Sequence, residues 1–66
     1  MKKITVNGRP RETAAADVAA LIAELGFANG TVLVEHNGTA LRPADWTERV
    51  LEAGDRIELL RLAAGG

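Results

Sequence analysis

Residues 2–25, KKITVNGRPRETAAADVAALIAEL, have the pattern of a β-hairpin followed by an α-helix. Polar and apolar residues alternate over residues 2–6, as in a strand with one buried face. Asn7-Gly8 then favours a two-residue type I′ turn, because both residues tolerate positive φ. A second strand is expected over residues 9–12. Its proline predicts an edge strand, because proline cannot donate a ladder hydrogen bond.

The helix is expected over about residues 15–25. Its apolar residues recur at i, i+3, i+4 and i+7, which places them on one face: Val18, Leu21, Ile22 and Leu25. Gly26 suits the left-handed residue that ends a helix. Either Thr13 or Asp17 could be the N-cap, and the sequence does not choose between them.

Further β segments are expected after the helix. A strand over residues 31–37 lies between two Asn-Gly pairs, and alternate residues take opposite faces: Val32, Val34 and His36 on one, Leu33 and Glu35 on the other. Leu41 ends a short strand. Residues 43–46 form a turn or a single helical turn, in which Trp46 packs against the core. The last strand covers residues 56–62.

This order of elements indicates an α+β fold, with a mixed sheet of four to five strands and one main helix packed across one face. The folded domain is expected to span residues 1–62, followed by a flexible tail over residues 63–66 that ends in Gly-Gly. A chain of 66 residues has a marginal core. It is therefore a poor candidate for a self-contained enzyme.

The composition argues against several classes of function. The chain has no cysteine, which excludes disulfides, a thiol nucleophile and a Cys-ligated zinc site. Its net charge of −1 provides no electrostatic attraction to nucleic acid or to an anionic membrane. No apolar run approaches the roughly 20 residues of a membrane span, and no apolar signal-peptide segment follows Lys2-Lys3. We therefore expect a soluble cytoplasmic protein.

Few residues are candidates for catalysis. We interpret His36, the single histidine, as a partly buried structural residue rather than a base or a ligand. Glu48, Glu52 and Asp55 are interpreted as a solvated surface, because a metal site needs convergent ligands with defined spacing. No glycine-rich phosphate loop is present.

The outer face of the last strand is the first candidate for function. If the helix covers the side of Ile57 and Leu59, alternation leaves Leu60 and Leu62 facing solvent. Leu33 is expected beside them, and Glu58 shares their side of the strand. An exposed apolar patch of this kind favours a partner-binding face, which we assign to four residues: Leu33, Glu58, Leu60 and Leu62.

The terminal Gly65-Gly66 pair is the second candidate. A glycine carboxylate carries no side chain, so it can enter a narrow channel in another protein. There it can be activated as an acyl-adenylate, whose acyl carbon a nucleophile attacks. An Ala-Ala-Gly-Gly tail on a rigid domain therefore suits a tethered reactive carboxylate.

The whole chain resembles the ThiS-type sulfur carriers of thiamin biosynthesis, which are ubiquitin-like β-grasp proteins. The resemblance rests on five segments: ITVNG at 4–8, VEHNG at 34–38, RPADW at 42–46, GDRIE at 54–58 and GG at 65–66. The RPADW segment is similar to the ThiS pattern and separates the chain from ubiquitin itself.

The resemblance implies that a ThiF-type enzyme uses ATP and magnesium to adenylate the carboxylate of Gly66. Gly65 and Ala64 would thread into that partner. A sulfur donor protein then supplies the sulfur of a thiocarboxylate, and a ThiG-type thiazole synthase takes this sulfur for the thiazole ring. The protein would be a co-substrate without a bound cofactor, not an enzyme. Its leucine face would correspond to the partner-contact face of β-grasp proteins.

Several alternatives stay open. Another β-grasp sulfur carrier would use the same diglycine, for example the small subunit of molybdopterin synthase, or a carrier for cysteine synthesis or tRNA thiolation. A non-covalent β-grasp binding module would dock through Leu60 and Leu62 with an inert tail. Protein tagging through an isopeptide bond also uses a diglycine. The sulfur donor, the oligomeric state and the native or processed origin of the Gly66 terminus are likewise open.

Overall fold

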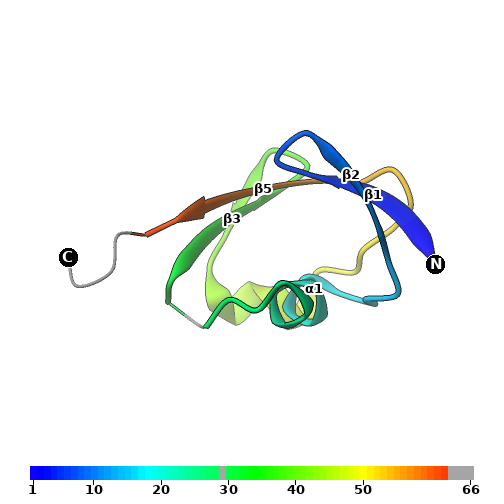
Figure 1. The fold of residues 1–66 in the computed structure, drawn as a ribbon. Helices are drawn as coiled ribbons and strands as arrows, with labels where there is room; N and C mark the ends of the chain where they lie inside the picture. Colours follow the sequence, from blue (N-terminus) through cyan, green and yellow to red (C-terminus); the bar gives the residue numbers. More distant parts are fainter. Residues whose placement is uncertain (29, 63–66) are drawn as a thin grey trace.

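The structure is a computed structural model that describes residues 1–28 and 30–62. Its elements, in chain order, are β1 (Lys2–Val6), β2 (Arg9–Thr13), α1 (Val18–Leu25), β3 (Val32–His36), β4 (Thr39–Leu41), the 3-10 helix η1 (Pro43–Glu48) and β5 (Arg56–Arg61). Within the described residues, the strands form one sheet in the order β2-β1-β5-β3-β4. Helix α1 lies across one face of this sheet (Figure 1).

The sheet is mixed, because β1 runs parallel to β5 whereas the other neighbouring strands are antiparallel. Together with helix α1, this confirms the predicted α+β architecture of the ubiquitin-like β-grasp type. Strand β5 is the middle strand, with β1 on one side and β3 on the other (Figure 1). Strand β1 pairs with β5 at Arg56 and Ile57, and β3 pairs with it from Ile57 to Arg61.

The Asn7-Gly8 and Asn37-Gly38 turns both have the backbone that a type I′ turn requires. In the β1–β2 hairpin, φ is 52° at Asn7 and 80° at Gly8. In the β3–β4 hairpin, φ is 51° at Asn37 and 87° at Gly38. Glycine and asparagine tolerate this left-handed region better than other residues, which explains why the hairpins form here. Strand β2 lies at the sheet edge, as its proline predicted.

Helix α1 begins at Val18, three residues later than predicted. Asp17 is the N-cap, and its carboxylate accepts a hydrogen bond from the Ala20 amide at 2.8 Å. The alanines before it do not extend the helix, because this segment pairs with the chain near Val50: Ala16 O accepts from the Leu51 amide at 3.0 Å. Tertiary pairing overrides alanine propensity here.

Thr13, the other N-cap candidate, connects β2 to α1 instead. It is fully buried. Its hydroxyl accepts from the Ala15 amide at 3.0 Å and donates to Glu24 at 2.8 Å. Glu24 also pairs with Arg11 at 2.8 Å, so one carboxylate of α1 is bound to two residues of the edge strand.

The core lies between α1 and the inner face of the sheet. Its most deeply buried side chains come from the sheet, from α1 and from the segment before β5: Ile4, Val18, Leu21, Ile22, Val34, Leu51 and Ile57. Trp46 of η1 is only 3% exposed and belongs to this cluster, as predicted. Among the described residues, no helix combines the length and the apolar character needed to cross a membrane.

Candidate functional site

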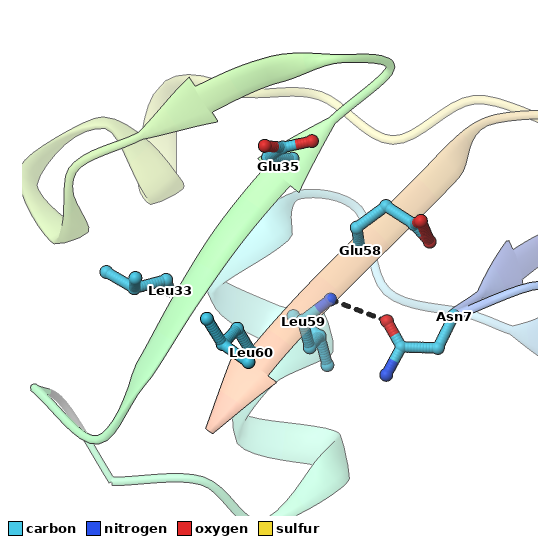
Figure 2. A pocket seen from close by; sticks show the side chains of 6 residues that line it. All are labelled: Asn7, Leu33, Glu35, Glu58, Leu59 and Leu60. Carbon is cyan, nitrogen blue, oxygen red and sulfur yellow. Dashed lines mark hydrogen bonds between the residues drawn. The ribbon is translucent and has the colours of Figure 1, made fainter. Parts of the chain in front are cut away.

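Five side chains that point away from α1, on β3, on β5 and directly after β5, form the candidate site. We call this set the outer face; it comprises Leu33, Glu35, Glu58, Leu60 and Leu62. Strand β3 pairs antiparallel with β5, and the register places Leu33 opposite Leu60 and Glu35 opposite Glu58. Leu60 is 63% exposed, Leu33 52% and Leu62 40%. The predicted exposure is therefore confirmed, and Figure 2 shows Leu33 and Leu60 side by side.

The alternation of side chains along β5 explains this exposure. Ile57 is fully buried and Leu59 is partly buried against the core, whereas Leu60 points to solvent. Strand β5 ends at Arg61, one residue earlier than predicted. The pairing with β3 nevertheless continues for one more residue, because the Leu62 amide donates to Thr31 O at 2.9 Å. Leu62 thus keeps the parity of Leu60.

Asn7 belongs to the site, although the sequence placed it only in a turn. Strand β1 pairs with β5 at Thr5 and Val6 and then turns away. The Asn7 side chain takes over, and its carbonyl oxygen accepts a hydrogen bond from the Leu59 amide at 2.6 Å. Asn7 and Leu59 line an open hollow together with four outer-face residues, Leu33, Glu35, Glu58 and Leu60 (Figure 2).

Glu35 was also missing from the predicted site residues. The sequence placed it on the side of Leu33, but it did not show that Glu58 lies directly opposite. Both carboxylates are exposed, and like charges in this arrangement destabilise a sheet. Within residues 1–28 and 30–62, neither carboxylate has a basic side chain within 4.0 Å.

His36 has the structural role that we predicted for it. It is 6% exposed. Its Nε2 lies 2.7 Å from Asp55 Oδ2, and its Nδ1 accepts a hydrogen bond from Arg49 Nε at 3.2 Å. In the parts of the chain that the structure describes, no three His, Cys, Asp or Glu side chains converge on a possible metal position.

The interpretation of Asp55 as part of a solvated surface was wrong. Its side chain is 13% exposed, and it accepts hydrogen bonds from His36, from the Glu52 amide at 2.9 Å and from Asn37 Nδ2 at 3.1 Å. Burial opposes ionisation of this carboxyl, but these hydrogen bonds outweigh it and hold the pKa of Asp55 below its ordinary value. Asp55 therefore stabilises the turn before β5.

The predicted tail residues Ala64, Gly65 and Gly66 lie outside the described residues. Their position in the chain still connects them to the outer face, because Leu62 precedes Gly66 by four residues. Four extended residues reach at most about 14 Å. A carboxylate on Gly66 is thus tethered within that distance of Leu62.

Comparison with known proteins agrees with this architecture. The sequence model of the ThiS family matches residues 4–66. The chain belongs to the ThiS family. Members of the ThiS family are thus its relatives over nearly its whole length, and the match includes the Gly65-Gly66 pair.

Two solved structures of similar proteins extend this result. One is the crystal structure of the thiamine biosynthesis protein ThiS from Geobacter metallireducens. It is 32% identical, has a TM-score of 0.78, and the alignment covers 97% of this chain and 99% of that one. The NMR solution structure of a thiamine biosynthesis protein from the same organism gives the same identity and TM-score, with coverages of 97% and 87%. A search of curated proteins finds no significant match.

Proposed function

We propose that this chain is a sulfur carrier whose Gly66 carboxylate is adenylated and converted to a thiocarboxylate, which donates sulfur for thiazole formation. The observation that carries the proposal is membership of the ThiS family over residues 4–66. The similar solved structures are of thiamine biosynthesis proteins, which favours thiazole over a pterin as the acceptor. The protein acts as a co-substrate, and its partners perform the catalysis.

The chemistry requires two steps at one carboxyl group. A Gly66 carboxylate oxygen attacks the α-phosphorus of ATP, and pyrophosphate leaves, which produces the acyl-adenylate. Sulfide supplied by the donor protein then attacks the acyl carbon, and AMP leaves with the former carboxylate oxygen, so the product is the thiocarboxylate. The ATP and magnesium belong to a ThiF-type activating enzyme, and the resulting thiocarboxylate is the substrate of a ThiG-type thiazole synthase.

The outer face supports this proposal because it lies close to the C-terminal tail. Leu33, Leu60 and Leu62 offer an exposed apolar surface on the last strand before the diglycine. A partner seated on this surface has the Gly66 carboxylate within about 14 Å of Leu62. Docking therefore keeps the Gly66 carboxylate close to the bound partner, which raises the effective concentration of this carboxylate at the partner.

A substitution at Gly66 tests the role of the tail. Gly66→Val is expected to leave the melting temperature unchanged, because the buried core of the described chain is built from residues between Ile4 and Ile57. The variant should lose activation, because a β-branched side chain blocks a channel that accepts only glycine. The readout is ATP–pyrophosphate exchange by a ThiF-type enzyme with each protein. Exchange at the wild-type rate with Gly66→Val would contradict the proposal.

A further inference from the structure

We propose that the carboxylates of Glu35 and Glu58 together bind a cationic side chain, an arginine or a lysine, of the protein that docks on the outer face. The leucines beside them pack against an apolar surface of the same partner. This inference rests on the proposed function, because it takes the activating enzyme as the docked protein. It specifies the charge and the position of the group on this chain that recognises the partner.

The register brings the two carboxylates together. Glu35 and Glu58 are direct cross-strand neighbours, so their Cβ atoms are about 5 Å apart. Two like charges at this separation repel each other and destabilise the sheet. A guanidinium or an ammonium group placed between them would pair with both carboxylates at once.

Basic side chains of the chain itself do not fulfil this role among the described residues. Arg56 lies on the same side of β5, two residues before Glu58, yet it forms no ion pair with either carboxylate. Arg61 lies over the Phe27 ring at 5.1 Å. Arg49 donates to His36. The negative charge of the Glu35–Glu58 pair is therefore left for a partner.

The neighbouring leucines make the two carboxylates more selective for a basic side chain. Leu33 and Leu60 form the next outward-facing pair along the same two strands, and they line the same hollow as both glutamates (Figure 2). When a partner covers the leucines, water leaves the surroundings of the carboxylates. An ion pair in that environment is stronger, and an unpaired carboxylate is more costly.

A second copy of this chain is a poor occupant of the outer face. A two-fold contact places the same surface of each copy against the other. Two Glu35–Glu58 pairs would then lie at one interface, and like-charge juxtaposition is strongly unfavourable there. The charge thus points to a different protein, with a basic side chain beside an apolar centre.

The experiment compares Glu35→Gln, Glu58→Gln and the double variant with wild type. Glu12→Gln is the matched control. Glu12 lies on the same side of the sheet as Glu35 and Glu58, but it is on the edge strand β2, where its cross-strand neighbour is Lys3. Affinity and association rate are measured with the ThiF-type enzyme at low and at physiological salt, and stability is measured by urea unfolding. Formation of the Gly66 thiocarboxylate is followed in the same samples.

We expect the double variant to be at least as stable as wild type and to bind at least about tenfold more weakly, with a slower and less salt-dependent association. Glu12→Gln should bind like wild type. Equal affinity and equal salt dependence of the double variant and wild type would overturn the inference. So would a wild-type dimer that Leu60→Glu dissociates.

The same data separate this inference from the proposed function. If wild type is converted to the thiocarboxylate but the double variant binds equally well, only the inference fails. If wild type binds, the double variant binds weakly and no adenylation occurs, the inference holds and the sulfur-carrier function fails. If wild type does not bind the enzyme at all, both fail.

Discussion

The hydrogen bonds around His36 determine its tautomer. Arg49 can only donate, so Nδ1 of the imidazole accepts and Nε2–H donates to Asp55. Both ring nitrogens are thus occupied within a nearly buried side chain. This arrangement joins β3, the segment after η1 and the turn before β5, and it explains why a histidine occupies an inward-facing strand position.

His36→Ala is expected to lower the free energy of unfolding by about 2–3 kcal/mol, because it empties a nearly buried position and removes the hydrogen bonds of the imidazole to Arg49 and to Asp55. Urea unfolding measures the effect. Activation at saturating partner concentration should persist. Unchanged stability with loss of activation would instead assign His36 a role in function.

The lowered pKa of Asp55 predicts how stability depends on pH. This carboxylate stabilises the fold above its ordinary, unfolded-state pKa, and the stabilisation disappears as the pH falls through the lower folded-state pKa. Asp55→Asn should therefore flatten the acid side of the stability profile, measured by urea unfolding between about pH 6 and pH 2. Parallel profiles of wild type and variant would contradict this assignment.

Asp45→Asn is the control for that experiment. Hydrogen bonds from Arg42 lower the pKa of Asp45 as well, but the Arg42 side chain is 81% exposed. Solvent screens an exposed pair, which contributes little to stability. We therefore expect the Asp45 variant to change the acid profile less than Asp55→Asn does.

Alternate residues of β5 face opposite sides of the sheet, and we propose a different role for each side. Its inward residues, Ile57 and Leu59, pack against the core. Its outward residues, Glu58 and Leu60, belong to the outer face. A change at one position should therefore affect binding, whereas the same change at the next position should affect folding.

Leu60→Glu and Leu59→Glu test this division. Leu60→Glu is expected to weaken partner binding at least about tenfold with little change in melting temperature, because it charges an exposed apolar contact. Leu59→Glu places a charge against the core and should destabilise the fold by several kcal/mol, on the order of 3. A collapse in the melting temperature of Leu60→Glu would show that Leu60 belongs to the core.

Asn7 secures the second half of β5 where β1 no longer pairs with it. Asn7→Gly retains a residue that tolerates positive φ but removes the side-chain acceptor of the Leu59 amide. Hydrogen exchange at Leu59 should become at least about tenfold faster, while the Ile57 amide in the paired part of the strand stays protected. Unchanged exchange at Leu59 would show that the Asn7 hydrogen bond contributes little.

For the molecule as a whole, local patterns predicted most elements. The Asn-Gly pairs gave both hairpins, because few other residues accept the required backbone. Alternation along residues 56–62 gave the exposure of Leu60, and the burial of Trp46 followed from its place after a proline turn. These predictions depend on residues that are close together in the sequence, so one sequence is enough to make them.

The features that the sequence did not predict depend on contacts between distant segments. The Glu35–Glu58 pairing needs the register of β3 on β5, and the Asn7 hydrogen bond joins residues 52 positions apart. Asp55 becomes buried only when β3 brings His36 and Asn37 to it. The late start of α1 has the same origin, since Ala16 pairs with a segment far along the chain.

The central claim is that Gly66 carries sulfur, and the intact mass of the protein tests it most directly. The chain is incubated with ATP, magnesium, sulfide and a ThiF-type enzyme that activates a known carrier. We predict a mass increase equal to the difference between sulfur and oxygen, located at Gly66 by fragmentation. Fragmentation is needed because oxidation of Met1 shifts the mass similarly. An unchanged mass, or a shift found only at Met1, would contradict the sulfur-carrier function.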